Sequence, residues 1–123
     1  MSPSPDASPA LTLEAFRKET STVLAGLEHP PLGSGVALAE ECGEVAKILL
    51  DVHGYGRPLD PAALAGELVD VLVCIAEIAT AHGIDLDRAA RTKLDDLARR
   101  APAWRADPVL MQALAKRRAA AAP

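Results

Sequence analysis

The chain has few of the residues from which β-sandwiches and β-barrels are built. Its 123 residues include only three aromatic side chains (Phe16, Tyr55 and Trp104), together with eight Val and four Ile. All-β folds draw on β-branched and aromatic residues, so an all-β fold is excluded. In their place stand 25 Ala and 17 Leu, which favour helices. A core of such small side chains is thin, and we expect it to be shared within an oligomer.

Signals for export and for membrane insertion are also lacking. The longest apolar stretch, Leu68 to Ala81, is interrupted by Asp70 and Glu77, so it is not a spanning helix. The first ten residues lack basic side chains and an apolar run, and are not a signal peptide. Their Pro and Ser content predicts a disordered leader, residues 1–10. We therefore expect a cytoplasmic protein.

The two cysteines lack the CxxC spacing of a redox or zinc motif. Cys42 and Cys74 occupy apolar helix positions, which predicts buried thiols in a reducing compartment.

Charge is distributed unevenly along the chain. Residues 1–87 carry 14 acidic and 4 basic side chains, a net charge of -10. Residues 88–123 carry 9 basic and 3 acidic side chains, a net charge of +6. An acidic body followed by a basic segment suits a metal–phosphate ligand, because carboxylates hold the cation and Lys and Arg bind phosphate. The simpler interpretation is that part of the basic segment is a solvated tail.

Start and stop signals predict five helices and an all-α, four-helix bundle-type domain with a short extra C-terminal helix. The first helix is expected over residues 12–27 and the second from Ser34, as N-cap, to residue 53. The third is expected from Pro61, behind the N-cap Asp60, to residue 83, and the fourth from Asp85 to the residue before Pro102. The fifth starts at Asp107. The predicted domain covers residues 11–101, and residues 102–123 form the C-terminal helix and a frayed tail.

Three acids lie on one side of the second predicted helix. Glu40, Glu41 and Glu44 span an arc of about 100°, opposite an apolar arc. Taken alone, this is the pattern of an amphipathic helix with a solvated acidic face.

The third predicted helix changes this interpretation. Glu67 and Asp70 share a face with Leu64 and Val71, and apolar residues surround nearly the whole helix, as in buried helices. A buried carboxylate needs a cation. Nearby Lys, Arg or His side chains could serve, but five acids together favour a divalent ion, and an all-oxygen ligand set favours Mg²⁺ or Mn²⁺. No Glu-x-x-His pair is present, which disfavours a helical di-iron centre relative to a Mg²⁺ or Mn²⁺ site.

The two acidic motifs together resemble a known family. Glu40-Glu41-Cys42-Gly43-Glu44, followed after 22 residues by Glu67-Leu68-Val69-Asp70, resembles the EExxE…ExxD signature of the MazG-like all-α nucleoside triphosphate pyrophosphohydrolases. The resemblance covers roughly residues 12–101. It implies Mg²⁺-dependent cleavage of an NTP or dNTP between the α- and β-phosphates, giving the monophosphate and pyrophosphate. It also implies a homodimer or homotetramer, with no membrane or nucleic-acid polymer as partner.

The resemblance implies roles for individual residues. Glu41, Glu44, Glu67 and Asp70 correspond to metal ligands, and Glu40 to a ligand of a further ion or the group that orients the water. Glu40 and Glu41 are thus the catalytic candidates. Lys93 and Arg100 correspond to phosphate-binding residues, although both also suit an ordinary charged helix surface. Phe16 is a candidate for stacking on the base, and core packing is its alternative.

One position departs from the family pattern and keeps other functions open. Between Lys93 and Arg100 the family often has Asn, where this chain has Leu97, which cannot hydrogen-bond. The main alternative is therefore a catalytically degenerate dimer acting as an interaction or regulatory protein. A second alternative is phosphoribosyl-ATP pyrophosphohydrolase, which shares the fold and the acidic signature.

Overall fold

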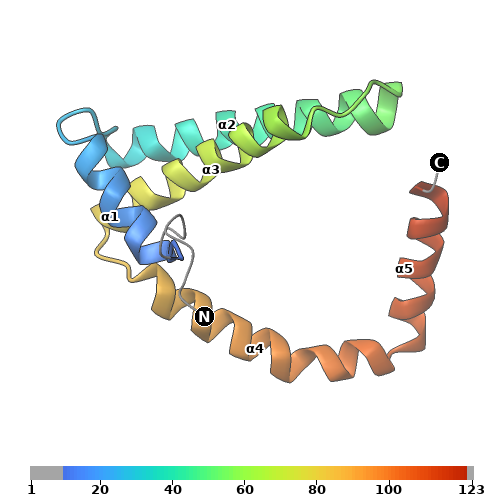
Figure 1. Cartoon of the computed structure of the whole chain (residues 1–123). Coiled ribbons are helices and arrows are strands. Elements are labelled where there is room, and N and C mark those ends of the chain that lie inside the picture. Colours follow the sequence, from blue (N-terminus) through green and yellow to red (C-terminus); the bar gives the residue numbers. More distant parts are fainter. Residues whose placement is uncertain (1–9, 122–123) are drawn as a thin grey trace, which may run out of the picture. The chain divides into compact units, whose positions relative to one another are not determined.

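The computed structural model describes residues 10–121, and this part of the chain is entirely helical (Figure 1). Five helices follow one another: α1 (Leu13–Val23), α2 (Pro31–Tyr55), α3 (Pro61–Ala81), α4 (Leu86–Ala106) and α5 (Pro108–Ala121). The all-α prediction is confirmed. None of the described helices is long and apolar enough to cross a membrane. The predicted leader lies outside the described residues, apart from Ala10.

Three helices begin within one residue of their predicted starts, each behind a side-chain cap. The Thr12 hydroxyl accepts a hydrogen bond from the N–H of Ala15 at 3.0 Å, which fixes the start of α1. Asp60 accepts from the N–H groups of Ala62 and Ala63, and Pro61 occupies the first position of α3. Asp107 caps α5 in the same way. These caps are local, so the sequence is enough to place them.

The predicted start of α2 is wrong. The helix begins at Pro31, and Ser34 lies inside it as a buried residue with 1% exposure. The Ser34 hydroxyl does not cap the helix. It donates to the carboxylate of Glu77 on α3 at 3.3 Å. A tertiary partner therefore replaces the local cap on which the prediction relied.

Two predicted helix ends are also wrong. α1 ends at Val23 rather than residue 27, and Gly26 follows with a φ of +80°. α4 continues through Pro102 to Ala106, although a proline inside a helix costs about 3 kcal/mol. Pro102 removes the hydrogen bond to the carbonyl of Ala98, yet the helix resumes at once.

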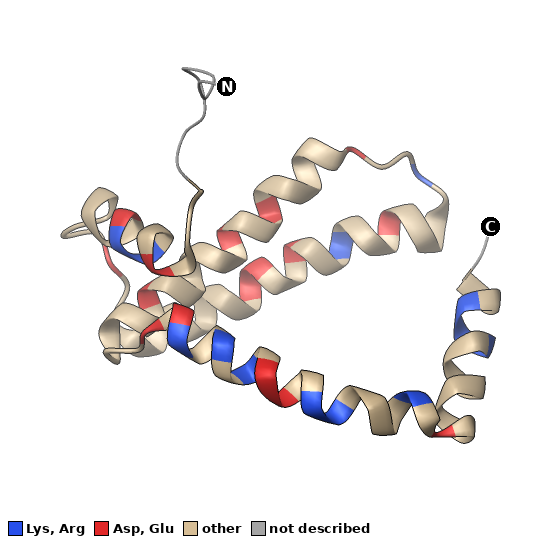
Figure 2. Ribbon diagram, turned by 60° about the horizontal axis from the view of Figure 1, so that its bottom comes forward, with Lys and Arg blue, Asp and Glu red and all other residues tan. Residues whose placement is uncertain are grey.

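The chain forms two compact units, residues 1–87 and 88–123. In the first unit, α3 packs against both α2 and α1, and α2 and α3 run antiparallel side by side (Figure 1). The second unit contains most of α4 and all of α5. Most charged positions of α2 and α3 are acidic, whereas α4 carries both signs with more basic than acidic positions, and the charged positions of α5 are basic (Figure 2). A domain boundary at residue 101 stays a prediction.

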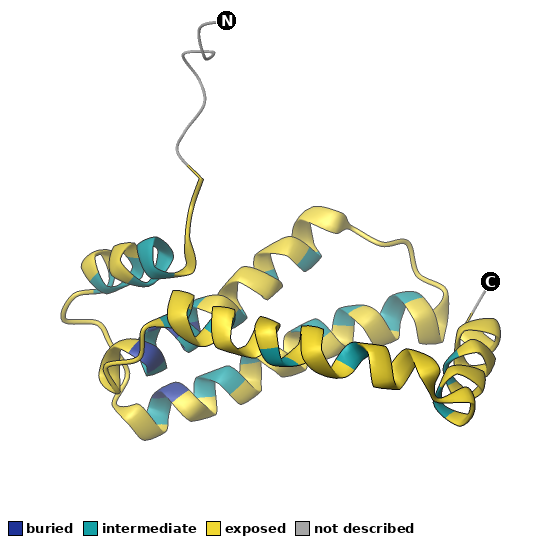
Figure 3. Cartoon of the chain, turned by 90° about the horizontal axis from the view of Figure 1, so that it is seen from below, coloured by how far each residue is buried: buried dark blue, intermediate teal, exposed yellow. Residues whose placement is uncertain are grey.

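Very little of the described chain is buried (Figure 3). Among residues 10–121, only Ser34, Cys74, Ala76 and Ala79 are buried. The expectation that α3 is buried all round is wrong for the single chain, because Leu68 and other large residues of α3 are 39% to 48% exposed. α1 and α2 cover only two sides of α3. Cys74 is buried as predicted, but Cys42 is exposed.

Candidate metal centre

The turn between α2 and α3 brings the two acidic segments face to face. α2 ends at Tyr55, and Gly56 follows as the C-cap with a φ of +68°, a left-handed conformation that glycine adopts without strain. The N–H of Arg57 donates to the carbonyl of Asp51 at 3.0 Å and closes the helix end. A short loop then leads to the Asp60 cap. The antiparallel arrangement that results sets Glu41 of α2 beside Glu67 and Asp70 of α3.

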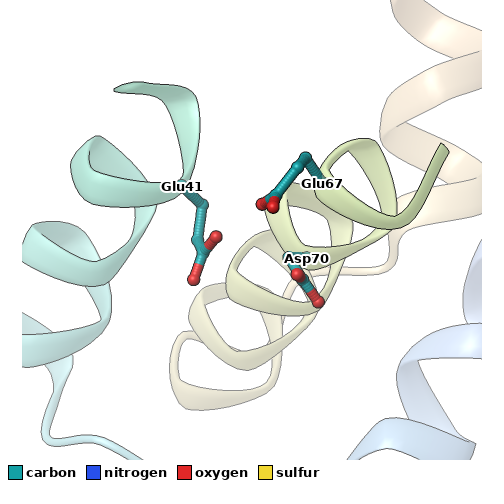
Figure 4. A group of neighbouring side chains, drawn as sticks. All are labelled: Glu41, Glu67 and Asp70. Carbon is teal, nitrogen blue, oxygen red and sulfur yellow. The ribbon is translucent and has the colours of Figure 1, made fainter. Parts of the chain in front are cut away.

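These three carboxylates form one group. Each of Glu41, Glu67 and Asp70 offers an oxygen, and these oxygens all lie within 4.8 Å of one another. In Figure 4, Glu41 reaches from α2 toward α3, and Glu67 points back toward it. Glu41 and Glu67 are half-buried. Asp70 is exposed, so the expectation that α3 shields it from water is wrong for the single chain.

The electrostatics of the group favour a cation. Partial burial raises the pKa of Glu41, and the negative charges of Asp70 and Glu67, then of Glu40 and Glu44, raise it further. A positive ion between the helices would remove this repulsion. The donor set is made only of carboxylate oxygens, which fits Mg²⁺ or Mn²⁺.

The other two acids of the first motif lie beside the group rather than in it. Glu40 and Glu44 are exposed on α2, and neither belongs to the set of oxygens that lie within 4.8 Å. Both are near enough for their charges to raise the pKa of Glu41.

The predicted phosphate-binding residues belong to α4. Lys93 is exposed. Arg100 donates to Asp96 at 3.3 Å, and its guanidinium carbon lies 4.8 Å from the centroid of the Trp104 ring. Hydrogen bonds from Arg100 and then from Arg99 lower the pKa of Asp96. Arg100 is therefore held within its own helix by a carboxylate and an aromatic ring.

Phe16, the candidate for base stacking, is half-buried on α1.

The structure adds a second polar cluster that the sequence analysis did not find. The carboxylate of Glu77 accepts hydrogen bonds from Ser34 and from Nδ1 of His29, at 3.3 and 3.1 Å. A signal was present in the sequence: Ser34 lies seven residues before Glu41, and Glu77 seven residues after Asp70. Glu41 lies beside Asp70, and α2 and α3 run antiparallel. A residue seven positions before Glu41 therefore lies opposite a residue seven positions after Asp70.

Comparison with protein families gives one match. Residues 34–104 match the MazG nucleotide pyrophosphohydrolase domain. The matched range spans more than half of the chain and contains all five acids of the two motifs, together with Lys93 and Arg100. No protein of curated function matches the chain significantly.

Proposed function

The chain belongs to the MazG nucleotide pyrophosphohydrolase domain family, and from that premise we propose that it is a Mg²⁺-dependent nucleotide pyrophosphohydrolase. Its substrate is an NTP or dNTP, and the bond cleaved lies between the α- and β-phosphates. The products are the nucleoside monophosphate and pyrophosphate. The observation that carries the proposal is the group of three carboxylates, contributed by two helices, whose oxygens lie within 4.8 Å.

We assign the metal-holding role to Glu41, Glu44, Glu67 and Asp70. When bound, Mg²⁺ supplies charge neutralisation at the phosphate oxygens and lowers the pKa of a coordinated water. Mn²⁺ is the alternative ion. The raised pKa of Glu41 supports this assignment, because repulsion among ionised carboxylates is the condition that a bound cation relieves.

Glu40 and Glu41 are assigned to catalysis. Glu40 is exposed at the edge of the carboxylate group, where its oxygens can orient the attacking water and accept its proton. Lys93 and Arg100 are assigned to the β- and γ-phosphates, which need positive charge as they leave. Phe16 is assigned to the base, on which its ring can stack.

We propose that the active form is a homodimer or a pair of dimers. The described part of the chain buries only four residues and leaves large apolar side chains exposed on α2 and α3, among them Val36, Leu50, Leu68, Val69 and Leu72. A two-fold interface lets one apolar stripe cover its own copy. A cytoplasmic location fits the two free thiols, Cys42 and Cys74.

An inactive, regulatory dimer is the second candidate. Leu97 stands where the family often has Asn, and Arg100 is already engaged by Asp96 and Trp104. Both observations argue against phosphate binding by α4. The five acids of the two motifs, in contrast, are all present.

Pyrophosphate release separates the two candidates. The assay uses a panel of NTPs and dNTPs, with and without Mg²⁺. We expect release that requires Mg²⁺ and that falls at least about a hundredfold in Glu41→Gln. The matched control, Glu19→Gln, changes an exposed carboxylate on α1 and is expected to retain full activity. Absence of release from every nucleotide, in a folded protein that binds Mg²⁺, would favour the regulatory dimer.

A further inference from the structure

A cavity of about 170 Å³ lies between α1 and α3, away from the carboxylate group. Its lining includes the apolar Leu24 and Ala76 and the polar Thr20, Glu77 and Thr80. Ala76 has no exposed surface, so the cavity is backed by one of the few buried residues of the chain. Apolar walls with a few polar atoms are typical of small-molecule sites.

Glu77 offers this cavity an unused acceptor. Its side chain is only 7% exposed, and both of its hydrogen bonds, from Ser34 and His29, go to Oε2. In the described part of the chain, no hydrogen bond reaches Oε1. Oε1 keeps some contact with solvent on an otherwise largely buried side chain, so a ligand that carries an N–H group can replace water as its donor.

Thr80 offers a donor beside that acceptor. Its hydroxyl oxygen accepts a hydrogen bond from Nη1 of Arg17 at 3.1 Å, and Glu14 holds Arg17 through both carboxylate oxygens. A hydroxyl that accepts in this way keeps its own proton for another acceptor. Glu77 and Thr80 are three residues apart on α3, so they lie on the same side of the helix. The cavity thus presents an acceptor and a donor as neighbours.

We propose that this cavity binds the base of the substrate and selects bases that carry an exocyclic amino group next to an unprotonated ring nitrogen. Cytosine and adenine present this edge, with the amino group as donor to Glu77 and the ring nitrogen as acceptor from Thr80. Uracil, thymine and hypoxanthine present the reverse, a carbonyl next to an N–H. Their carbonyl oxygen would face a carboxylate oxygen, which is repulsive.

The position of the cavity suits this role. Glu77 follows Asp70 by seven residues, which is two turns or about 10.5 Å along α3, with a rotation of only about 20°. Glu77 and Asp70 therefore lie on one stripe of the helix. The cavity therefore lies about two helix turns from the carboxylates along α3, and the proposal places the base there while the phosphates lie at the carboxylates. The inference rests on the proposed function, because it assigns the base of the same substrate.

Binding of nucleoside monophosphates tests the selection without metal or catalysis. Isothermal titration of the full-length protein in EDTA compares CMP and AMP with UMP and IMP. We expect CMP and AMP to bind about tenfold more tightly or better. In Glu77→Gln the amide N–H₂ replaces Oε1, so the preference should shift toward UMP and IMP. The matched control, Glu19→Gln, changes an exposed carboxylate on α1 that does not line the cavity and should keep the preference.

A second variant, Thr80→Val, tests the same proposal if Glu77→Gln does not fold. Thr80→Val keeps the shape of the side chain and removes the donor, so the discrimination between CMP and UMP should shrink. Equal affinity of the unaltered protein for CMP and UMP would overturn the base assignment, even where pyrophosphate release establishes the enzyme. Discrimination without any pyrophosphate release would support the base assignment and refute the proposed function.

Discussion

A carboxylate oxygen of Glu14, near the start of α1, accepts a hydrogen bond from the backbone N–H of Leu86, the first residue of α4, at 2.7 Å. In return, the N–H of Glu14 donates to the side chain of Asp87 at 3.3 Å. Each helix start therefore supplies the other with a partner for a backbone N–H that has none within its own helix. The same Glu14 carboxylate holds Arg17, whose guanidinium reaches Thr80.

Acid should weaken this junction. Hydrogen bonds from Arg17 and from the N–H of Leu86 lower the pKa of Glu14. A carboxyl whose pKa is lowered by folding stabilises the fold above its unfolded pKa, and this contribution is lost as the pH falls through the folded pKa. We expect Glu14→Gln to be less stable at pH 7 and to lose less stability between pH 5 and pH 2. Urea unfolding followed by circular dichroism measures the free energy of unfolding at each pH. If Glu14→Gln lost as much stability between pH 5 and pH 2 as the unaltered protein, the role of Glu14 would be contradicted.

Divalent cations should raise the melting temperature. A ligand that binds only the folded state stabilises it by mass action, by about 2.7 kcal/mol at one hundred times its dissociation constant. We expect Mg²⁺ and Mn²⁺ to raise Tm by several degrees, and Asp70→Asn to remove most of this rise while leaving the helical spectrum intact. Asp95→Asn, which changes an exposed acid on α4, is the control. An Asp70→Asn protein with a full response to metal would disprove the assignment.

Lys93 should discriminate between phosphate chains. Its positive charge is assigned to the leaving pyrophosphate, so Lys93→Ala should weaken the binding of a triphosphate more than that of a monophosphate. A loss of about tenfold is expected for the triphosphate, measured with a non-hydrolysable analogue. Equal losses for both ligands would show that Lys93 does not contact the β- or γ-phosphate.

Assembly should involve the exposed stripe of α3. Leu72 is 39% exposed in the single chain. A charge there would be desolvated in a dimer, so Leu72→Glu should weaken association at least about tenfold and reduce activity with it. Leu11→Glu, which lies before α1, serves as the control. Sedimentation of the unaltered protein as a stable, folded monomer at low micromolar concentration would contradict the obligate dimer.

Features that depend on neighbouring residues in the sequence were predictable, and features that depend on tertiary contacts were not. The cap at Asp60 follows from local chemistry, and the sequence places it. Ser34 resembles a cap equally well, but the buried carboxylate of Glu77 takes its hydroxyl. The shared faces of Glu41, Glu67 and Asp70 follow from helix periodicity, whereas their closeness depends on how α2 packs against α3.

The equal seven-residue spacings on α2 and α3 determine which changes of chain length the protein tolerates. One residue inserted between Asp70 and Glu77 would rotate Glu77 by about 100° relative to Asp70 and move it off their common stripe. An insertion between Ser34 and Glu41 would do the same on α2. The loop between Gly56 and Asp60 lies outside both spacings and can absorb added residues. Within these two helical segments, a substitution leaves the spacing between the paired residues unchanged. An insertion or a deletion changes it and separates Ser34 from Glu77 or Glu41 from Asp70.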